Sequence, residues 1–493
     1  MAGLIHSLDH ADNVRLALSP LTAQSHKSEF GQFMTPSSVA RFMASLFPPS
    51  QLPACRLLDA GAGVGALSCA FLDRWQSGGF GFEMVDAFAY EIDGKLHAHL
   101  ARHLSAYQGV TPHVIGGDFI ALNTQGALLT QGGYTHAILN PPYKKINSSS
   151  LHRRALRTVG IETVNLYSAF VALAVELAAP GGQIVAIIPR SFCNGPYYRP
   201  FRDYVLARAS LCQMHLFEAR NKAFKDDDVL QESIIVRFER GGRQGTVTVS
   251  TSTDDSFSDM MVNEHPFNRI VFPEDLERFI HVPTTLEKSS IELSDAAKFS
   301  LADIGVKVST GPVVDFRLKD HLRDTPEPGT VPLLYPGHFS ALGTEWPKPD
   351  SKKPNAIQFN DDTRKWLYPN GFYCVVRRFS AKEERRRIVA SLVDPADFDG
   401  APMLGFENHL NVFHEEKHGL PVTLAAGLAA FLNTTAVDES FRRFNGHTQV
   451  NATDLRLLKY PSRANLMRLG EWAMAAHPLT QAMLDAQFEG MTA

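Results

Sequence analysis

Between residues 56 and 240, short apolar runs alternate with segments long enough to form helices. The runs are Arg56–Asp59, Met84–Tyr90, His113–Ile115, His136–Leu139, Gln183–Ile188, Leu211–Phe217 and Ser233–Phe238. Strands that alternate with helices in this way form a parallel sheet with helices on both faces. The sequence therefore predicts an α/β fold with a doubly wound, Rossmann-like sheet in this part of the chain.

The rest of the chain lacks this alternation. Gly, Thr, Ser and Asp dominate residues 241–267 with little periodicity, which indicates a boundary. Farther on, turns rich in proline separate short β-like runs such as Phe372–Val376, which predicts a mixed, irregular second domain. We expect four parts, namely a sheet domain at 1–245, a linker at 246–299, the irregular domain at 300–465 and a helical tail at 466–493.

Charge and cysteine usage limit the function classes. The net charge is −4, from 48 Lys and Arg against 52 Asp and Glu, so a polyanionic partner must be met by a local patch. The 5 cysteines form no C-x-x-C pair, which predicts no metal site and favours a reducing compartment, the cytoplasm. The most apolar stretch, Leu166–Pro180, contains Glu176 and is shorter than the ~20 residues of a membrane span, so we expect no membrane partner.

A glycine-rich turn follows the first apolar run, in the sequence Asp59-Ala60-Gly61-Ala-Gly63-Val-Gly65. Glycines let the backbone approach a ligand closely, and the helix that follows points its N–H groups at that ligand. The spacing differs from the dinucleotide-binding G-x-G-x-x-G, which favours a ligand without phosphate. A tight strand-to-helix turn also needs glycine when nothing binds, so this turn alone does not establish a site.

Acidic residues follow the next two apolar runs. Glu91, followed by Ile92, lies 28 residues beyond Gly63 and is a candidate acceptor for ribose hydroxyls. Asp118 could accept a hydrogen bond from an adenine amine, and Phe119 could cover the ring. Each acid also has a structural interpretation, as a solvated carboxylate at position 91 and as a helix cap at position 118.

The tetrad Asn140-Pro141-Pro142-Tyr143 follows the buried run His136–Leu139, at the strand end where open α/β sheets bind ligands. The prolines prevent further strand pairing and stiffen the turn. The Asn140 side chain and the Pro141 carbonyl can therefore act as adjacent acceptors for one amino group. Tyr143 can stack on the ring that carries this amine. A simple turn does not require this combination, so we predict that the tetrad is catalytic.

The tetrad resembles the catalytic Asn-Pro-Pro-Tyr of S-adenosylmethionine-dependent amino-methyltransferases. The order of the motifs is similar to that of gamma-order adenine-N6 DNA methyltransferases of Type II restriction-modification systems, the TaqI/XhoI-like modification enzymes. In these enzymes a segment before the glycine turn covers the methionine end of the cofactor. The resemblance implies that S-adenosyl-L-methionine is the cofactor and that it is bound by Thr35, Pro36, Asp59, Ala60, Gly61, Gly63, Glu91, Ile92, Asp118 and Phe119.

The resemblance continues more faintly beyond the sheet domain, in the stretches around Arg377–Phe379 and around residues 446–455. It implies that residues 300–465 are a target-recognition domain and that the partner is double-stranded DNA. Phe224 lies where this family keeps an aromatic residue that stacks on the flipped target base.

Residue types in the second domain agree with this in part. From Arg377 to Arg387 there are six basic and two acidic residues, which could be a phosphate-binding patch or an exposed, salt-bridged helix face. The candidate phosphate contacts are Arg377, Arg378, Arg385 and Arg386. Thr448, Gln449 and Asn451 carry groups that can read base edges, or they could cap a helix that begins near Thr453.

These features favour adenine-N6 methylation that protects host DNA, beside a separately encoded restriction endonuclease. One alternative is a methyltransferase of the same fold that acts on a protein glutamine or on RNA. The other is a non-catalytic, DNA-binding subunit of a restriction-modification system. The large C-terminal domain favours the first interpretation, because glutamine enzymes with this tetrad are much shorter. An intact tetrad disfavours a purely binding role.

Overall fold

The computed structural model describes residues 7–18, 34–124, 133–217, 232–273, 275–283, 297–340, 343–380, 384–398, 400–444, 449–476 and 479–492. The chain divides into two compact units, Met1–Leu286 and Glu287–Ala493, which are described separately below. Within the described residues, no helix has both the length and the apolar character that crossing a bilayer requires.

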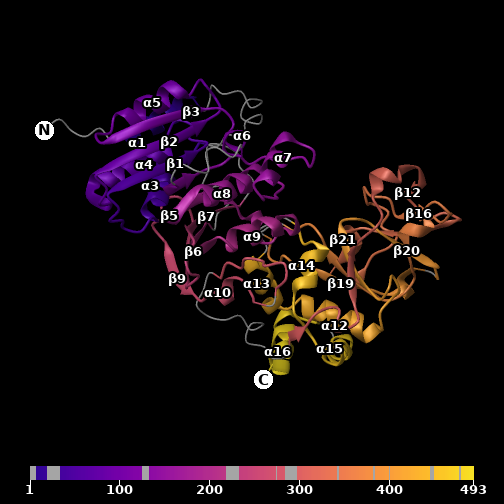
Figure 1. The fold of residues 1–493 in the computed structure, drawn as a ribbon. Helices are drawn as coiled ribbons and strands as arrows, with labels where there is room; N and C mark the ends of the chain where they lie inside the picture. Colours follow the sequence, from indigo (N-terminus) through magenta and orange to yellow (C-terminus); the bar gives the residue numbers. More distant parts are fainter. Residues whose placement is uncertain are drawn as a thin grey trace. The chain divides into compact units, whose positions relative to one another are not determined.

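Unit 1 is built on a nine-stranded mixed sheet in the order β3-β2-β1-β4-β5-β7-β6-β8-β9 (Figure 1). The strands are β1 (Ala54–Ala60), β2 (Met84–Glu91), β3 (Val110–Gly116), β4 (Tyr134–Leu139), β5 (Ala178–Pro189), β6 (Ala209–Phe217), β7 (Ser233–Arg240), β8 (Val247–Ser252) and β9 (Met261–His265). Strand β1 pairs in parallel with both β2 and β4, whereas β7 runs antiparallel between β5 and β6. The strand order reverses at β1, so the carboxyl ends of β1 and β4 border the crevice where such sheets bind ligands.

Helices cover both faces of this sheet. Adjacent strand residues point to opposite sides, so a strand with consecutive apolar residues needs helices to cover it on both faces. Leu57 and Ile138 belong to one buried apolar cluster with α3 and α4, whereas the next residues, Leu58 and Leu139, belong to a second cluster with α8. The helices of unit 1 are α1 (Ser7–Leu18), α3 (Ser37–Ser45), α4 (Ala66–Arg74), α5 (His97–Ser105), α6 (Phe119–Asn123), α7 (Leu151–Thr158), α8 (Leu166–Leu177), α9 (Arg199–Leu206) and α10 (Phe267–Ile270). The predicted α/β fold is confirmed.

The predicted linker at 246–299 differs from the structure. Its first part forms β8, which pairs in parallel with β6, and β9, which pairs antiparallel with β8. Strand β8 is rich in Ser and Thr, yet Ser250 is buried and shares a hydrogen bond of 2.9 Å with Nδ1 of His215. Because its polar side chains form hydrogen bonds inside the sheet, this buried strand has the amino-acid composition of a loop, and composition alone does not predict it. The boundary between the compact units falls at residues 286 and 287 instead.

Unit 2 combines short strands with helices, as expected for a mixed and irregular domain. Its two larger sheets have the orders β11-β21-β18-β19 and β12-β16-β13-β20-β17. The strands are β10 (Ala297–Phe299), β11 (Lys307–Thr310), β12 (Leu322–Arg323), β13 (Thr330–Leu334), β14 (Phe339–Ser340), β15 (Gly343–Thr344), β16 (Ala356–Gln358), β17 (Leu367–Pro369), β18 (Tyr373–Arg377), β19 (Ala390–Val393), β20 (Met403–Phe406), β21 (Leu410–His414) and β22 (Tyr460–Pro461). The helices are α12 (Val422–Leu432), α13 (Thr435–Phe444), α14 (Ala452–Leu457), α15 (Arg463–Ala475) and α16 (Gln481–Thr492).

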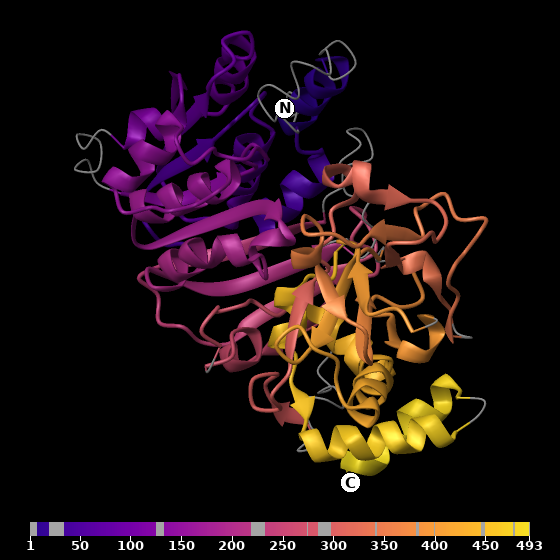
Figure 2. The same cartoon turned by 90° about the vertical axis from the view of Figure 1, so that its right-hand side faces the viewer.

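The helical character predicted for residues 466–493 is present, but these helices are part of the core of unit 2 rather than a tail (Figure 2, yellow). Leu469 of α15 and Phe488 of α16 are buried in the same apolar cluster as Leu428 of α12. Helices α12 and α15 pack closely against each other at Gly427 and Gly470. A Cβ atom at either glycine would overlap a backbone carbonyl of the facing helix.

We expect Gly470→Ala to lower the free energy of unfolding of unit 2 by about 3 kcal/mol, because the added methyl group forces the two helices apart. Gly490→Ala is the matched control, since a Cβ atom at that helical position meets nothing within 4 Å. It should leave stability unchanged or raise it by about 0.5–1 kcal/mol. Calorimetric unfolding of both variants tests this, and equal stability would show that α12 and α15 separate at no cost.

Candidate functional site

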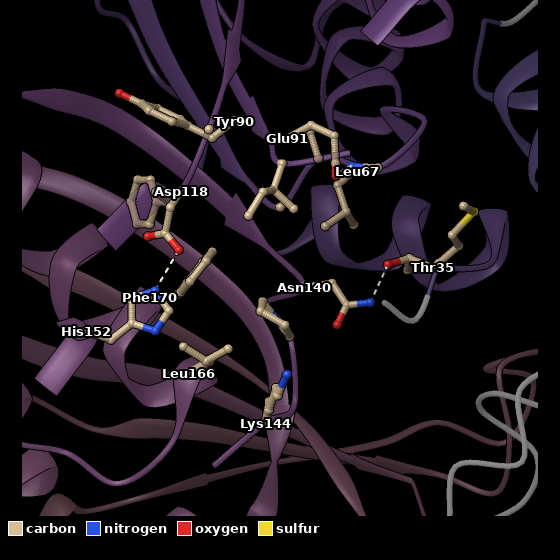
Figure 3. Close-up of a pocket in the computed structure, with 18 of the residues that line it drawn as sticks. Thr35, Leu67, Tyr90, Glu91, Asp118, Asn140, Lys144, His152, Leu166 and Phe170 are labelled. Carbon is tan, nitrogen blue, oxygen red and sulfur yellow. Dashed lines mark hydrogen bonds and ion pairs between the residues drawn. The ribbon is translucent and has the colours of Figure 1, made fainter. Parts of the chain in front are cut away.

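A cavity of about 420 Å³ lies at the carboxyl ends of β1, β2 and β4 (Figure 3). This volume suits a ligand of the size of a nucleoside or an amino-acid conjugate. The residues of its wall that the sequence predicted are Thr35, Gly61, Gly63, Glu91, Ile92, Asp118, Phe119, Asn140 and Pro142. The topology thus brings together motifs that are spread over more than a hundred residues of sequence.

The glycine turn joins β1 to α4 with three left-handed residues. Gly61, Gly63 and Gly65 have φ values of 81°, 58° and 88°. Side chains other than glycine rarely adopt this conformation, which is the physical reason for the spacing of the motif. The N–H groups of Gly61 and Ala62 both donate to the carbonyl of Tyr90 at 2.9 Å, so the turn is held against the end of β2.

Glu91 links the glycine turn to the end of β2 from inside the cavity wall. Its Oε2 accepts a hydrogen bond from the Gly63 N–H at 2.8 Å, and its Oε1 accepts one from the Asp93 N–H at 2.8 Å. The residue is only 3% exposed, and this burial raises the pKa of its carboxyl against the opposing effect of the two N–H donors. The predicted alternative of a solvated carboxylate is wrong.

Asp59 lies outside the cavity wall, although it was predicted to bind the cofactor. The residue is 1% exposed, and its Oδ2 accepts hydrogen bonds from the backbone N–H and the hydroxyl of Ser68, at 3.2 and 2.7 Å. The carboxyl thus fixes the start of α4 beneath the glycine turn. Burial raises its pKa to about 7, despite the hydrogen bonds from Ser68, and the negative charge of Glu91 adds to this increase. The other predicted residues that lie outside the cavity wall are Pro36, Ala60, Pro141 and Tyr143.

The side chain of Asn140 is held at both ends. Its Nδ2 donates to the hydroxyl of Thr35 at 2.9 Å (Figure 3), and its Oδ1 accepts from the hydroxyl of Tyr143 at 3.3 Å. The Tyr143 hydroxyl also lies 3.2 Å from the carbonyl of Ile187 in β5. Burial raises the pKa of the Tyr143 phenol above its usual value, so the hydroxyl stays protonated. These contacts fix the orientation of the amide.

Asp118 is both a helix cap and part of the cavity wall, so the two interpretations of this residue hold together. Its Oδ1 accepts from the Ala121 N–H at 2.9 Å as the cap of α6. Its Oδ2 lies 2.7 Å from Nε2 of His152, the second residue of α7. Burial opposes ionisation, but the hydrogen bonds from His152 and Ala121 lower the pKa of Asp118 overall. The same contact raises the pKa of His152, although burial and Lys144 oppose this.

Sequence reasoning missed several residues of the wall. His152 comes from α7, and Leu166 and Phe170 come from α8, whose uniformly apolar sequence is typical of a core helix. Lys144 directly follows the tetrad, and this adjacency was the one signal available in the sequence. Among the described residues there is no group of three or more His, Cys, Asp or Glu side chains that could hold a metal ion.

The predicted arginines of unit 2 have different environments. Arg377 pairs with Glu384, and Arg378 donates to the carbonyl of Asn408 at 3.2 Å. Arg386 is half-buried, and its guanidinium donates to the side chain of Gln481 at 2.6 Å and to the carbonyl of Thr434 at 2.8 Å. Arg385 is exposed. The patch is therefore not one uniform basic face.

The structure also brings two predicted groups of unit 2 together. Gln449 accepts a hydrogen bond from Arg378 at 3.3 Å, so a candidate base-reading residue contacts a candidate phosphate-binding residue. Asn451 caps α14 in a capping box with Asp454, as the alternative interpretation of this segment expected. Thr448 and Phe224 lie outside the described residues.

Comparison with known proteins found a family model and two relatives that are all named as methylases or methyltransferases. The family model of the Eco57I restriction-modification methylase matches residues 105–224. The chain is 51% identical over 493 residues to the Type II methyltransferase M.BsuBI of Bacillus subtilis, which covers 98% of this chain and 97% of that protein. It is 41% identical over 465 residues to the Type II methyltransferase M.PstI of Providencia stuartii, covering 92% and 91% of the two chains.

Two solved structures resemble the fold at low sequence identity. The DrdV–DNA complex matches with a TM-score of 0.54 at 12% identity, over 96% of this chain and 60% of the other. The Type IIL restriction-modification enzyme MmeI in complex with DNA matches with a TM-score of 0.52 at 10% identity, over 98% and 72%. These two similarities concern the fold alone.

The raised pKa of Asp59 predicts a pH-dependent stability. The group is protonated more readily in the folded state, so its contribution is full below the unfolded pKa and is lost as the pH rises through about 7. The wild type should therefore lose roughly 2 kcal/mol of unfolding free energy relative to Asp59→Asn between about pH 5 and pH 7. Unfolding of both proteins across this pH range measures the difference. A difference that is independent of pH would contradict the prediction.

Proposed function

Because the chain belongs to the family of Type II restriction-modification methyltransferases, we propose that it methylates the N6 amine of a flipped adenine in double-stranded DNA, with S-adenosyl-L-methionine as the donor. The observation that carries this proposal is the anchored amide of Asn140 at the edge of a nucleoside-sized cavity. The biological role is protection of host DNA from a cognate restriction endonuclease that is encoded separately.

The residues of the cavity fit the proposed cofactor. Glu91 offers a buried carboxylate for ribose hydroxyls, and Asp118 offers an acceptor for the adenine amine. Phe119 and Phe170 supply apolar contact surface for the adenine ring. In Figure 3, Asp118 lies on the opposite side of the cavity from Thr35, which suits an elongated ligand. When bound, S-adenosylmethionine supplies a methyl group on a positively charged sulfur, which is already activated for transfer.

The tetrad activates the target amine by accepting its hydrogen bonds. An adenine amine is a poor nucleophile, since its lone pair is delocalised into the ring. The Asn140 oxygen and the Pro141 carbonyl together favour a tetrahedral nitrogen, which frees the lone pair for attack. The Thr35 contact keeps the amide NH₂ turned away from this role. No general base is required, so the site contributes chiefly positioning and electrostatic stabilisation.

The target amine lies inside the base stack of duplex DNA, so the base must rotate out before it reaches Asn140. Rotation costs a few kcal/mol, which stacking in the enzyme offsets. We assign this stacking to Tyr143, whose ring is half-buried, and to Phe224. The similarity to Type II methyltransferases over nearly the whole chain favours DNA over a protein glutamine or RNA. The intact tetrad favours catalysis over a purely binding role.

The decisive experiment incubates the purified chain with duplex DNA and S-adenosylmethionine that carries a labelled methyl group. We expect the label in N6-methyladenine when the DNA is digested to nucleosides and analysed by mass spectrometry. Single-molecule sequencing of DNA from an expressing host then gives the sequence context. Label in N4-methylcytosine would overturn the choice of base, and label in protein or RNA would overturn the substrate class.

Asn140→Ala should nearly abolish methyl transfer and leave the affinity for S-adenosylhomocysteine within about twofold, because Asn140 serves the target amine. Glu91→Ala should show the opposite pattern, with affinity reduced about tenfold or more, because the ribose hydroxyls lose their acceptor. Transfer assays and isothermal titration calorimetry measure the two effects. Normal turnover by Asn140→Ala would rule out the proposed role of the tetrad.

Alanine substitutions of the neighbouring residues Arg385 and Arg386 should have different effects on DNA binding and on stability. Arg385→Ala should weaken binding to all duplexes alike and reduce the slope of log affinity against log salt by about 1, since one phosphate contact is lost. Arg386→Ala should lower the melting temperature instead and keep the salt slope, because its guanidinium holds Gln481 and the Thr434 carbonyl. Binding measured at several salt concentrations decides this. Equal salt slopes for Arg385→Ala and the wild type would refute the assignment.

A further inference from the structure

His152 lies in the cavity wall, but the proposed reaction gives it no role. Its Nε2 is 2.7 Å from Oδ2 of Asp118, and the two side chains are 37% and 30% exposed. The contact joins the first turn of α7 to the cap of α6, so it connects two residues that are 34 positions apart in sequence. In Figure 3, the imidazole points at the Asp118 carboxylate beside Phe170.

The position of His152 is fixed by the helix that carries it. The hydroxyl of Ser150 caps α7 by accepting from the Arg153 N–H at 3.2 Å. Leu156 anchors the helix in the apolar core, and Glu162 pairs with the side chains of Arg153 and Arg157. His152 is therefore held in place, which lets it restrict the side chain that it contacts.

The contact determines which acceptor sites of Asp118 remain for a ligand. An ionised carboxylate offers about four lone-pair sites. The Ala121 N–H takes one on Oδ1, and the His152 Nε2–H takes one on Oδ2. The backbone of Ile120 also donates to this carboxylate. Donors from α6 and α7 thus prevent the carboxylate from rotating, so its remaining acceptor sites point in fixed directions. Lys144 is the other charged group that acts on the imidazole, and Asp118 remains ionised under these contacts.

We propose that His152 is a positioning residue for the cofactor, which fixes the Asp118 carboxylate as the acceptor for the adenine amine. The proposal rests on the proposed function, because it takes S-adenosylmethionine as the ligand of the cavity. In this proposal, His152 and Asp118 act together to select a ligand that carries an amino group at this end of the cavity. A hydrogen bond between charged partners is strong enough to change ligand affinity about tenfold.

The test compares two ligands that differ at the group in question. S-adenosylhomocysteine carries the adenine amine, whereas S-inosylhomocysteine carries a carbonyl oxygen in its place. We expect His152→Ala to weaken binding of the first ligand about tenfold and to change binding of the second by less than about twofold, as measured by isothermal titration calorimetry. A residue that only packs against the ring would weaken both ligands equally.

Two further variants separate the hydrogen bond from the bulk of the ring. His152→Gln keeps a donor of similar reach and should retain most of the affinity for S-adenosylhomocysteine. His152→Phe keeps the ring without a donor and should lose as much as His152→Ala. This pair also decides the question if the alanine variant folds poorly.

His113→Ala is the matched control. His113 and Asp86 form a similar pair in unit 1, with an Nε2–Oδ1 distance of 3.0 Å and exposures of 38% and 39%, outside the cavity wall. Its loss should leave both affinities unchanged. Equal losses for the two ligands in His152→Ala, or no loss for either, would overturn the proposal. Failure of the wild type to bind S-adenosylhomocysteine would overturn the proposed function itself.

Discussion

The hydrogen bond from the Gly63 N–H to the buried carboxylate of Glu91 holds the glycine turn against the end of β2. Burying a carboxylate is unfavourable unless hydrogen-bond donors replace the lost water. Gly63 and Asp93 supply two backbone donors, one for each oxygen. The turn and the acid therefore depend on each other, since the turn presents its N–H only with three left-handed glycines. Together they form one part of the cavity wall.

The same arrangement recurs at two other polar groups of the wall, Asn140 and Asp118, each of which is held by a residue distant in sequence. Thr35 holds Asn140 across 105 residues of sequence, and His152 holds Asp118. Asp59 likewise holds the start of α4, through its hydrogen bond from the hydroxyl of Ser68. Contacts of this kind fix side chains before a ligand arrives, so binding does not have to order them. Such preorganisation is the contribution that methyl transfer without a general base requires most.

The placement of Glu91, Asp118 and Asn140 was predictable because each lies at or just after the end of a strand, and the carboxyl ends of parallel strands meet at one edge of a sheet. Residues that reach the cavity from helices were not predictable in this way. His152 arrives there through the packing of α7, which no local pattern specifies. The direction of Asp59 was also misjudged, since a strand residue beside a glycine turn can face the following helix as well as the ligand.

Unit 2 was harder to predict for a different physical reason. A run of arginines indicates positive charge, but burial depends on partners distant in sequence, as Gln481 is for Arg386. Polar strands cause a similar error in unit 1, where Ser250 of β8 is buried by its contact with His215. In both cases the deciding hydrogen bond joins residues that are 35 or more positions apart. Composition describes a segment, whereas such pairs are properties of the folded chain.

The contact between Thr35 and Asn140 has a consequence for the order of events during translation. Thr35 leaves the ribosome 105 residues before its partner. At roughly 5–20 residues per second, this interval lasts roughly 5–20 s. At the start of that interval neither β1 nor its two neighbours, β2 and β4, has been synthesised, and β4 directly precedes Asn140. The hydrogen bond between Thr35 and Asn140 can therefore form only after β4 has been synthesised, when both neighbours of β1 are present in the chain.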